Sequence, residues 1–100
     1  MAKTSGGVRD GYRSYRNLFD EEYNYHRENM MREARGASTE RLERTLAEWQ
    51  RYPRATSYKE AMRQPVYFGY MDRNDVLSAA AAARARLDVL QGELKRRKRR

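Results

Sequence analysis

Cysteine is absent from this 100-residue sequence, which excludes disulfides, thiolate zinc sites and cysteine nucleophiles. Its absence favours an intracellular, reducing compartment such as the cytoplasm, the nucleoid or an organelle matrix. No apolar run approaches the roughly 18 residues that indicate a membrane-spanning helix, so we expect no membrane span. Residues 1–9 also lack the apolar core of a secretory signal.

Branched aliphatic residues are scarce, with seven Leu, four Val and no Ile. Alanine, glutamate, arginine, leucine and methionine are abundant, and these residues favour helix over strand. One hundred residues also suffice for a single domain only. We therefore expect an all-α fold, a small bundle of three or four helices with a long C-terminal helix and a flexible basic tail.

Signals for catalysis are also lacking. The single histidine, His26, has no cysteine to pair with, and no nucleophile elbow, zinc-protease motif or phosphate-binding glycine loop occurs. Glu22 lies one helical turn before His26, but the histidine sits on an aromatic and apolar face, where a packing role is usual. We expect no enzyme, no cofactor, no metal and no small-molecule substrate.

The first part of the chain divides into an arm and a helix. Residues 1–11 contain three glycines and scattered charges, which predicts a flexible arm. Residues 12–35 have helical spacing, with one face formed by Tyr12, Phe19, Tyr23, His26 and Met30. Gly36 can adopt the left-handed conformation that ends many helices.

Two further helices are predicted from capping residues and prolines. Ser38 suits the N-cap of a helix over 39–52, which Pro53 ends. Its narrow apolar stripe consists of Leu42, Leu46 and Trp49. Ser57 and Glu60 have the spacing of a capping box, which predicts a short helix that stops before Pro65.

Residues 66–71 form an apolar stretch between two helices. We expect an extended connector here, because a single strand would have no partner. Its aromatic residues could fill the core or stack on unpaired bases, and they are Tyr67, Phe68 and Tyr70.

The last helix should begin at Asp72 or Asn74, both of which suit an N-cap. Apolar residues then recur at spacings of three and four, which indicates a seam for packing against another helix of this chain or of a partner. The seam consists of Val76, Ala80, Ala83, Leu87, Leu90 and Leu94. Gly92 weakens helix propensity near the end, so the helix could fray from there.

Positive charge is concentrated at the C-terminal end. The net charge is +8, yet without the basic run 95–100 only 16 basic residues stand against 14 acidic ones. Such a run attracts phosphates, although a solvated or localisation tail, or a tail that binds an acidic protein or a membrane surface, has the same composition. The candidate nucleic-acid-binding residues are Arg84, Arg86, Lys95, Arg96, Arg97, Lys98, Arg99 and Arg100. The expected organisation is therefore an arm over 1–11, a helical domain over 12–94 and a basic tail over 95–100.

Two short segments resemble known families. Residues 1–9, Met-Ala-Lys-Thr-Ser-Gly-Gly-Val-Arg, resemble the starts of small uncharacterised prophage or mobile-element proteins. That resemblance implies functions such as a virion component or an inhibitor of a host defence nuclease. Residues 14–19, Ser-Tyr-Arg-Asn-Leu-Phe, resemble more weakly the opening of LYR-motif proteins, which are small basic helical accessory factors of mitochondrial complexes.

Two functions are compatible with these features. The leading hypothesis is a non-enzymatic helical protein that binds nucleic acid or a ribonucleoprotein through its basic C-terminal end. The alternative is a protein-protein interaction module that docks on a protein partner, or on a second copy, through the seam of the last helix. Such a module could be a subunit, a virion component or a phage-type nuclease inhibitor.

Overall fold

Four helices make up the fold of this computed structural model, which describes residues 2–51, 53–66 and 72–98. They are α1 (Ala2–Gly36), α2 (Thr39–Arg51), α3 (Tyr58–Arg63) and α4 (Arg73–Lys98). The all-α fold with a long C-terminal helix is confirmed. The molecule is elongated, with extents of 51 × 31 × 19 Å.

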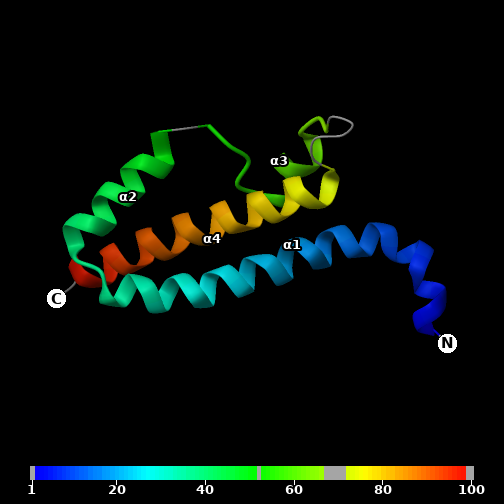
Figure 1. Cartoon of the computed structure of the whole chain (residues 1–100), viewed down its shortest axis with the longest axis horizontal. Coiled ribbons are helices and arrows are strands. Elements are labelled where there is room, and N and C mark those ends of the chain that lie inside the picture. The colour runs from blue at the N-terminus through cyan, green and yellow to red at the C-terminus, as the bar shows by residue number, and fades with distance from the viewer. Residues whose placement is uncertain (1, 52, 67–71, 99–100) are drawn as a thin grey trace.

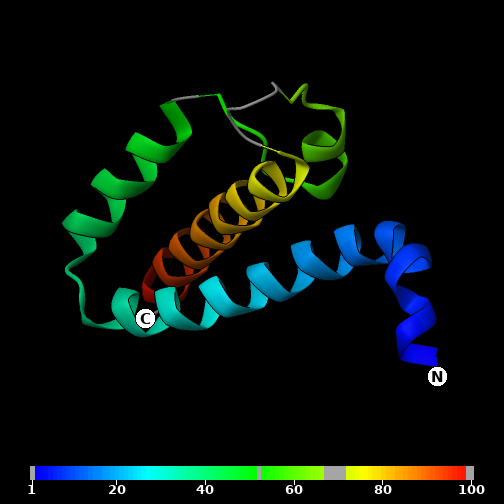
Figure 2. The same ribbon diagram turned by 45° about the vertical axis from the view of Figure 1, so that its right-hand side comes forward.

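Helix α4 is the central element. It packs against each of the other three helices, whereas the other three share little contact with one another among the described residues. Figures 1 and 2 show α1 and α4 side by side and running in the same direction, with α2 and α3 on the opposite side of α4. The long seam expected on the last helix therefore packs inside the chain.

Apolar packing between the helices forms two clusters, one toward each end of α4. The first joins α4 to α1 and α3 and consists of Phe19, Ala61, Val76, Leu77, Ala80 and Ala81. The second joins α4 to the last turns of α1 and the start of α2 and consists of Ala34, Leu42, Val89, Leu90 and Leu94. The small alanines allow close approach of the helices, which offsets the scarcity of large aliphatic residues.

The residues predicted to cap the starts of the helices accept hydrogen bonds from backbone N–H groups there. Ser38 Oγ accepts from Arg41 N–H at 3.1 Å, as expected of the N-cap of α2. Ser57 Oγ accepts from Glu60 N–H at 3.1 Å, but the Glu60 carboxylate accepts from the N–H of Thr56 rather than that of Ser57. At the start of α4, Asp72 and Asp75 each accept the other's backbone N–H, at 3.0 and 3.1 Å.

The predicted limits of the first helix differ from the structure. Helix α1 begins at Ala2 rather than near residue 12, so its first turns lie where a flexible arm was expected. Adding a residue to an existing helix gains one hydrogen bond, which can outweigh the low propensity of glycine. These first turns bend away from the other helices in both views (Figure 1, Figure 2).

The end of α1 also differs from the prediction. Gly36 is the last residue of the helix, and its φ lies outside the left-handed region. Instead, Ala34 O accepts from Ala37 N–H at 3.2 Å and from a guanidinium of α4. The last carbonyls are thus satisfied by a distant side chain, so a left-handed glycine is not required.

At the other end of the chain, α4 continues past Gly92 to Lys98, so residues 95–98 of the expected tail are helical. Arg99 and Arg100 lie outside the described residues. So do Tyr67, Phe68 and Tyr70, and with them residues 67–71 of the connector expected over 66–71.

Candidate nucleic-acid interface

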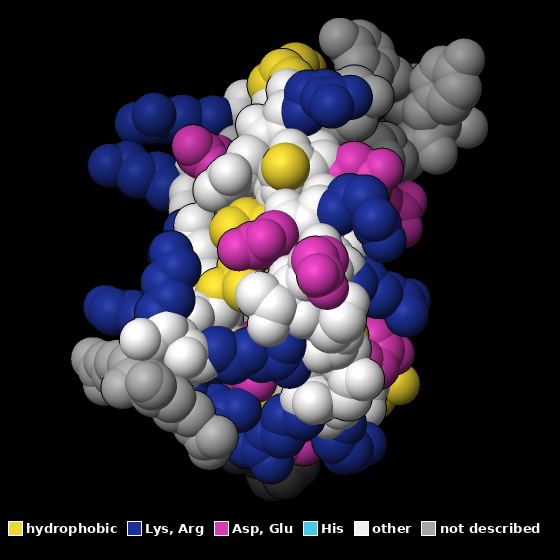
Figure 3. All heavy atoms as spheres, turned by 90° about the vertical axis from the view of Figure 1, so that its left-hand side faces the viewer, with side chains coloured by type: hydrophobic (Ala, Val, Ile, Leu, Met, Phe, Trp, Pro, Cys, Tyr) yellow, Lys and Arg dark blue, Asp and Glu magenta, His cyan; other side chains and the backbone are white. Residues whose placement is uncertain are grey.

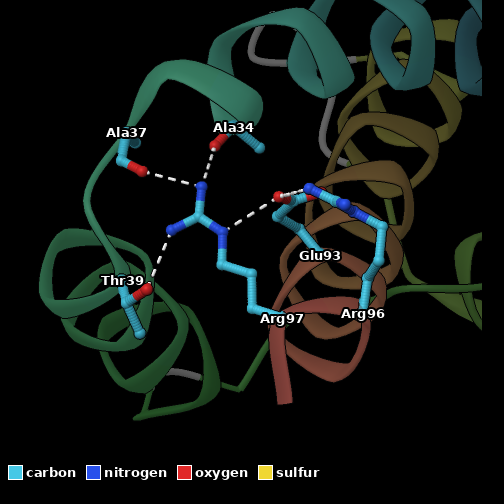
Figure 4. Close-up of polar contacts among 6 residues, drawn as sticks. All are labelled: Ala34, Ala37, Thr39, Glu93, Arg96 and Arg97. Carbon is cyan, nitrogen blue, oxygen red and sulfur yellow. Dashed lines mark hydrogen bonds and ion pairs between the residues drawn. The ribbon is translucent and has the colours of Figure 1, made fainter. Parts of the chain in front are cut away.

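Among residues 95–98, the described part of the basic run, Arg97 is the most enclosed cation, with 22% of its side chain exposed. Its Nη2 donates to the carbonyls of Ala34 and Ala37 at 3.0 and 2.8 Å, and Nη1 donates to Thr39 Oγ1 at 2.9 Å. Figure 4 shows the guanidinium between the end of α1, the following turn and the start of α2. Arg97 therefore joins three segments of the chain, and most of its donors face protein rather than solvent.

Glu93 fixes the position of Arg97 and of its neighbour Arg96. Arg96 donates to the carboxylate from Nε and Nη2, at 3.1 and 2.7 Å, and Arg97 donates from Nε at 2.9 Å. These hydrogen bonds, first from Arg96 and then from Arg97, lower the pKa of Glu93 from its ordinary 4.5 to about 2. Two of the predicted phosphate-binding cations are thus paired within the chain (Figure 4).

Arg84 lies apart from the basic run near the end of α4. It forms an ion pair with Asp88 at 3.2 Å, and Asp88 also accepts from Tyr23 Oη at 2.6 Å. Burial, followed by this hydrogen bond, raises the pKa of Tyr23 above its usual value. Since each helical residue advances about 1.5 Å, Arg84 is roughly 16 Å along the axis from Lys95. The predicted set therefore does not form one continuous surface.

Arg86 faces the interior side of α2. Its guanidinium lies 4.7 Å from the centroid of the Trp49 ring, and that of Arg54 lies 4.2 Å from the same centroid. The Nε atom of Arg86 is buried and has no hydrogen-bond partner among the described atoms. Arg86 is thus held between α4 and α2 by its contact with Trp49, and it is not part of the exposed basic run.

Lys95 and Lys98 are exposed on the last turns of α4. The contacts of Arg97 place three other exposed cations at the same end: Arg32 and Arg35 near the end of α1, and Arg41 in the first turns of α2. Arg35 and Arg96 line one groove between α1 and α4. Glu33 and Glu40 also lie nearby, so the charge is mixed but predominantly positive.

We refer to the exposed cations Arg32, Arg35, Arg41, Lys95, Arg96 and Lys98 as the basic end. Figure 3 views the molecule from this side, and Lys and Arg side chains gather over its lower part with acidic side chains between them. The contributions of α1 and α2 were not predicted from the sequence. The short turn between those helices was visible in the sequence, but its position beside residue 97 depends on tertiary packing.

The six seam residues predicted as a partner interface lie mainly inside the molecule. Leu87 is half-buried. The other five are buried against the chain's own helices, and they are Val76, Ala80, Ala83, Leu90 and Leu94. In this structure the seam is therefore part of the intramolecular core.

Comparisons with known proteins gave no relative: no family model, no curated protein and no solved structure matched the chain. None of the described helices is both long enough and apolar enough to cross a membrane. Within the described ranges, no cluster of His, Asp and Glu side chains has the arrangement of a metal site. The geometry and charge of the helices are the basis for the functional proposal.

Proposed function

We propose that this protein binds nucleic acid, alone or within a ribonucleoprotein, through the basic end. The proposal rests on one observation: exposed cations from three helices gather at one end of the molecule. The remainder of the sequence is nearly balanced in charge, since 16 basic residues oppose 14 acidic ones outside residues 95–100. A localised cationic surface of this kind attracts the phosphate backbone.

The expected contacts are to phosphates rather than to base edges. Lysine and arginine side chains on exposed helix ends can follow a phosphate backbone, and such contacts position a protein without reading sequence. Binding should therefore weaken strongly as salt rises, because it depends on the release of counterions. Arg97 should contribute mainly by holding the turn after α1 beside the end of α4, which brings the cations of the three helices together.

A protein-protein interaction module is the other function expected from the sequence. Five of its six proposed interface residues are buried in the chain's own core, so it would require α4 to separate from its neighbours or a different surface. That alternative receives less support than the basic end.

The test compares two charge-reversal variants with equal changes in net charge. Lys95→Glu with Lys98→Glu alters the basic end, while Lys59→Glu with Arg63→Glu alters exposed residues of α3 at the far end of α4. Fluorescence anisotropy with mixed-sequence DNA and RNA would measure affinity at about 50 mM salt, where phosphate contacts are strong. Circular dichroism would establish that both variants are folded.

We expect the basic-end variant to bind at least about tenfold more weakly than the α3 variant, because two phosphate contacts become repulsive. Equal affinities for the two variants would overturn the proposal. So would the absence of binding by the wild-type protein at low salt. Assembly with a protein that survives nuclease and high salt would instead support the interaction module.

A further inference from the structure

A cavity of about 510 Å³ lies between the end of α1, the first half of α2 and the second half of α4. Its lining combines charged groups from all three helices with an apolar floor, and includes Arg32, Glu33, Arg41, Leu42, Arg86 and Leu90. Small-molecule sites typically have volumes of about 300–1,000 Å³ and a few convergent polar groups on an apolar lining. The cavity therefore has the size of a small-molecule site, although its lining is more polar than apolar.

The charged groups of the lining are not neutralised by one another. The lining residues include three arginines, Arg32, Arg41 and Arg86, and one acidic residue, Glu33. Among the described residues, neither Arg41 nor Arg86 forms an ion pair, and Arg32 donates a long 3.4 Å hydrogen bond to Asn29 Oδ1. This lining carries an excess of positive charge and spare hydrogen-bond donors.

Arg86 is the lining cation that has a buried hydrogen-bond donor without a partner in the described part of the chain. It is half-buried, and its buried Nε has no hydrogen-bond partner among the described atoms. A buried donor without a partner destabilises the fold, and for a charged group the cost is larger. Arg86 lines the cavity and the contact with Trp49 fixes its guanidinium, so an anion in the cavity would meet a cation that is already positioned.

The cavity walls are also held by the Arg97 contacts. Ala34 and Ala37, whose carbonyls accept from Arg97, line the cavity, and Thr39 is two residues before the lining residue Arg41. Arg97 thus satisfies carbonyl groups at the end of α1 that would otherwise repel an anion. Both the shape and the local charge of the cavity favour a negatively charged ligand.

We propose that this cavity binds the phosphate monoester group of a small molecule. A phosphate monoester carries about −1.5 to −2 charges at pH 7 and three acceptor oxygens, which matches three arginines opposed by one glutamate. Guanidinium groups bind such oxygens in bidentate geometry. The apolar floor of Leu42, Val89 and Leu90 would accommodate the organic part of the ligand.

This site shares Arg32 and Arg41 with the basic end, but phosphate binding in the cavity does not depend on the nucleic-acid contacts of Lys95 and Lys98. Lys95 and Lys98 do not line the cavity, whereas Arg41 and Arg86 do. A phosphate monoester can belong to a free metabolite or to the phosphorylated end of an oligonucleotide. The same chemistry serves both, and the experiment below separates the two sources.

The test uses the full-length protein and phenyl phosphate, a phosphate monoester with an apolar ring, titrated by isothermal calorimetry. The informative variant is Arg41→Gln, because Arg41 is exposed on α2 and its loss should leave the fold intact. Arg44→Gln is the matched control, since Arg44 is exposed on the same helix one turn later and does not line the cavity. Phenol in place of phenyl phosphate reports the contribution of the ring alone.

We expect phenyl phosphate to bind the wild type and Arg44→Gln equally, and Arg41→Gln at least about tenfold more weakly, as expected for loss of a charge-assisted hydrogen bond. No binding of phenyl phosphate at millimolar concentration would overturn the proposal, as would equal effects of the two substitutions. Equal binding of phenol would do so too.

Two comparisons distinguish this site from the exposed lysines of the basic end. The Lys95→Glu, Lys98→Glu variant should bind phenyl phosphate like the wild type, and an equally large loss there would place the phosphate on the outer surface and overturn the cavity site. A 5′-phosphorylated oligonucleotide that binds more tightly than its 5′-hydroxyl form, with the difference lost in Arg41→Gln, would identify a nucleic-acid end as the source. If the two oligonucleotides bind equally and phenyl phosphate binds the wild type, the source of the phosphate monoester is a free small molecule.

Discussion

At the first residue of α4, Arg73 donates from Nη1 to the carbonyls of Ala61 and Gln64, both at 2.6 Å. Near the last residue, Arg97 donates to the carbonyls of Ala34 and Ala37. Each arginine therefore satisfies carbonyl groups at the end of a neighbouring helix, α3 in one case and α1 in the other. The two ends differ in what surrounds that arginine.

The Arg73 end is closed by small apolar residues, and Ala61, Leu77 and Ala81 have no exposed surface. At the Arg97 end the cluster is less completely covered, with Leu94 9% exposed, and it borders the charged cavity. Glu93 is bound to Arg97, whereas Arg73 has no carboxylate partner among the described residues. One end thus depends mainly on apolar packing and the other on a network of charges, which leaves cations and a cavity open to ligands.

The largest effect is expected in the apolar end. Leu77→Ala should lower the free energy of unfolding by about 2–5 kcal/mol, because it removes a fully buried side chain and leaves a cavity. Leu94→Ala, at the other end, should lower it by less, because Leu94 is 9% exposed whereas Leu77 has no exposed surface. Urea denaturation followed by circular dichroism measures both. An equal or greater loss in Leu94→Ala would contradict the assignment of apolar stability to the Arg73 end.

A smaller loss in the free energy of unfolding should follow from removing the Arg97 contacts at the charged end. Arg97→Ala should cost about 1.5–3 kcal/mol, because it leaves carbonyls of α1 without a charged donor. Arg96→Ala is the control, since 52% of that side chain is exposed and exposed ion pairs contribute little to stability. The same urea titration compares the two. Similar losses would mean that the contacts to Ala34, Ala37 and Thr39 do not stabilise the fold.

The smallest effect concerns pH and distinguishes the two ends directly. Because the pKa of Glu93 falls from 4.5 to about 2 on folding, the ionised carboxylate stabilises the folded state above pH 4.5, and this stabilisation is lost as the pH falls toward 2. Glu93→Gln should therefore be less stable than the wild type near neutral pH, and the difference should disappear between these values. Thermal melts across this range measure it. A difference that did not change with pH would exclude Glu93 as the titrating group.

Local features of the fold were predictable from the sequence. Ser38, Ser57 and Asp72 cap their helices as their side chains indicate, and spacing alone predicted that the last helix would pack along its seam. The roles of Arg73, Arg96 and Arg97 were not predictable, because a guanidinium in a basic run looks the same whether it faces solvent or a carbonyl. Arg97 and Ala34 are separated by 63 residues, so only tertiary packing brings them together.

The candidate site was likewise predictable only in part. Lys95 and Lys98 are exposed as the sequence analysis assumed, but Arg84 and Arg86 lie elsewhere, and the cations of α1 and α2 were missed. The cavity has no counterpart in any short motif, since its arginines come from positions 32, 41 and 86. A site assembled from three helices leaves no local pattern to recognise.

The position of α4 at the centre of the bundle has a consequence for synthesis on the ribosome. The three helices that precede it in the chain have little contact with one another among the described residues, and each packs chiefly on α4. Short isolated helices are marginally stable in water. The nascent chain therefore has no cooperative core until α4 has left the exit tunnel, and Arg97, in the last turn of α4, completes the link between α1 and α2.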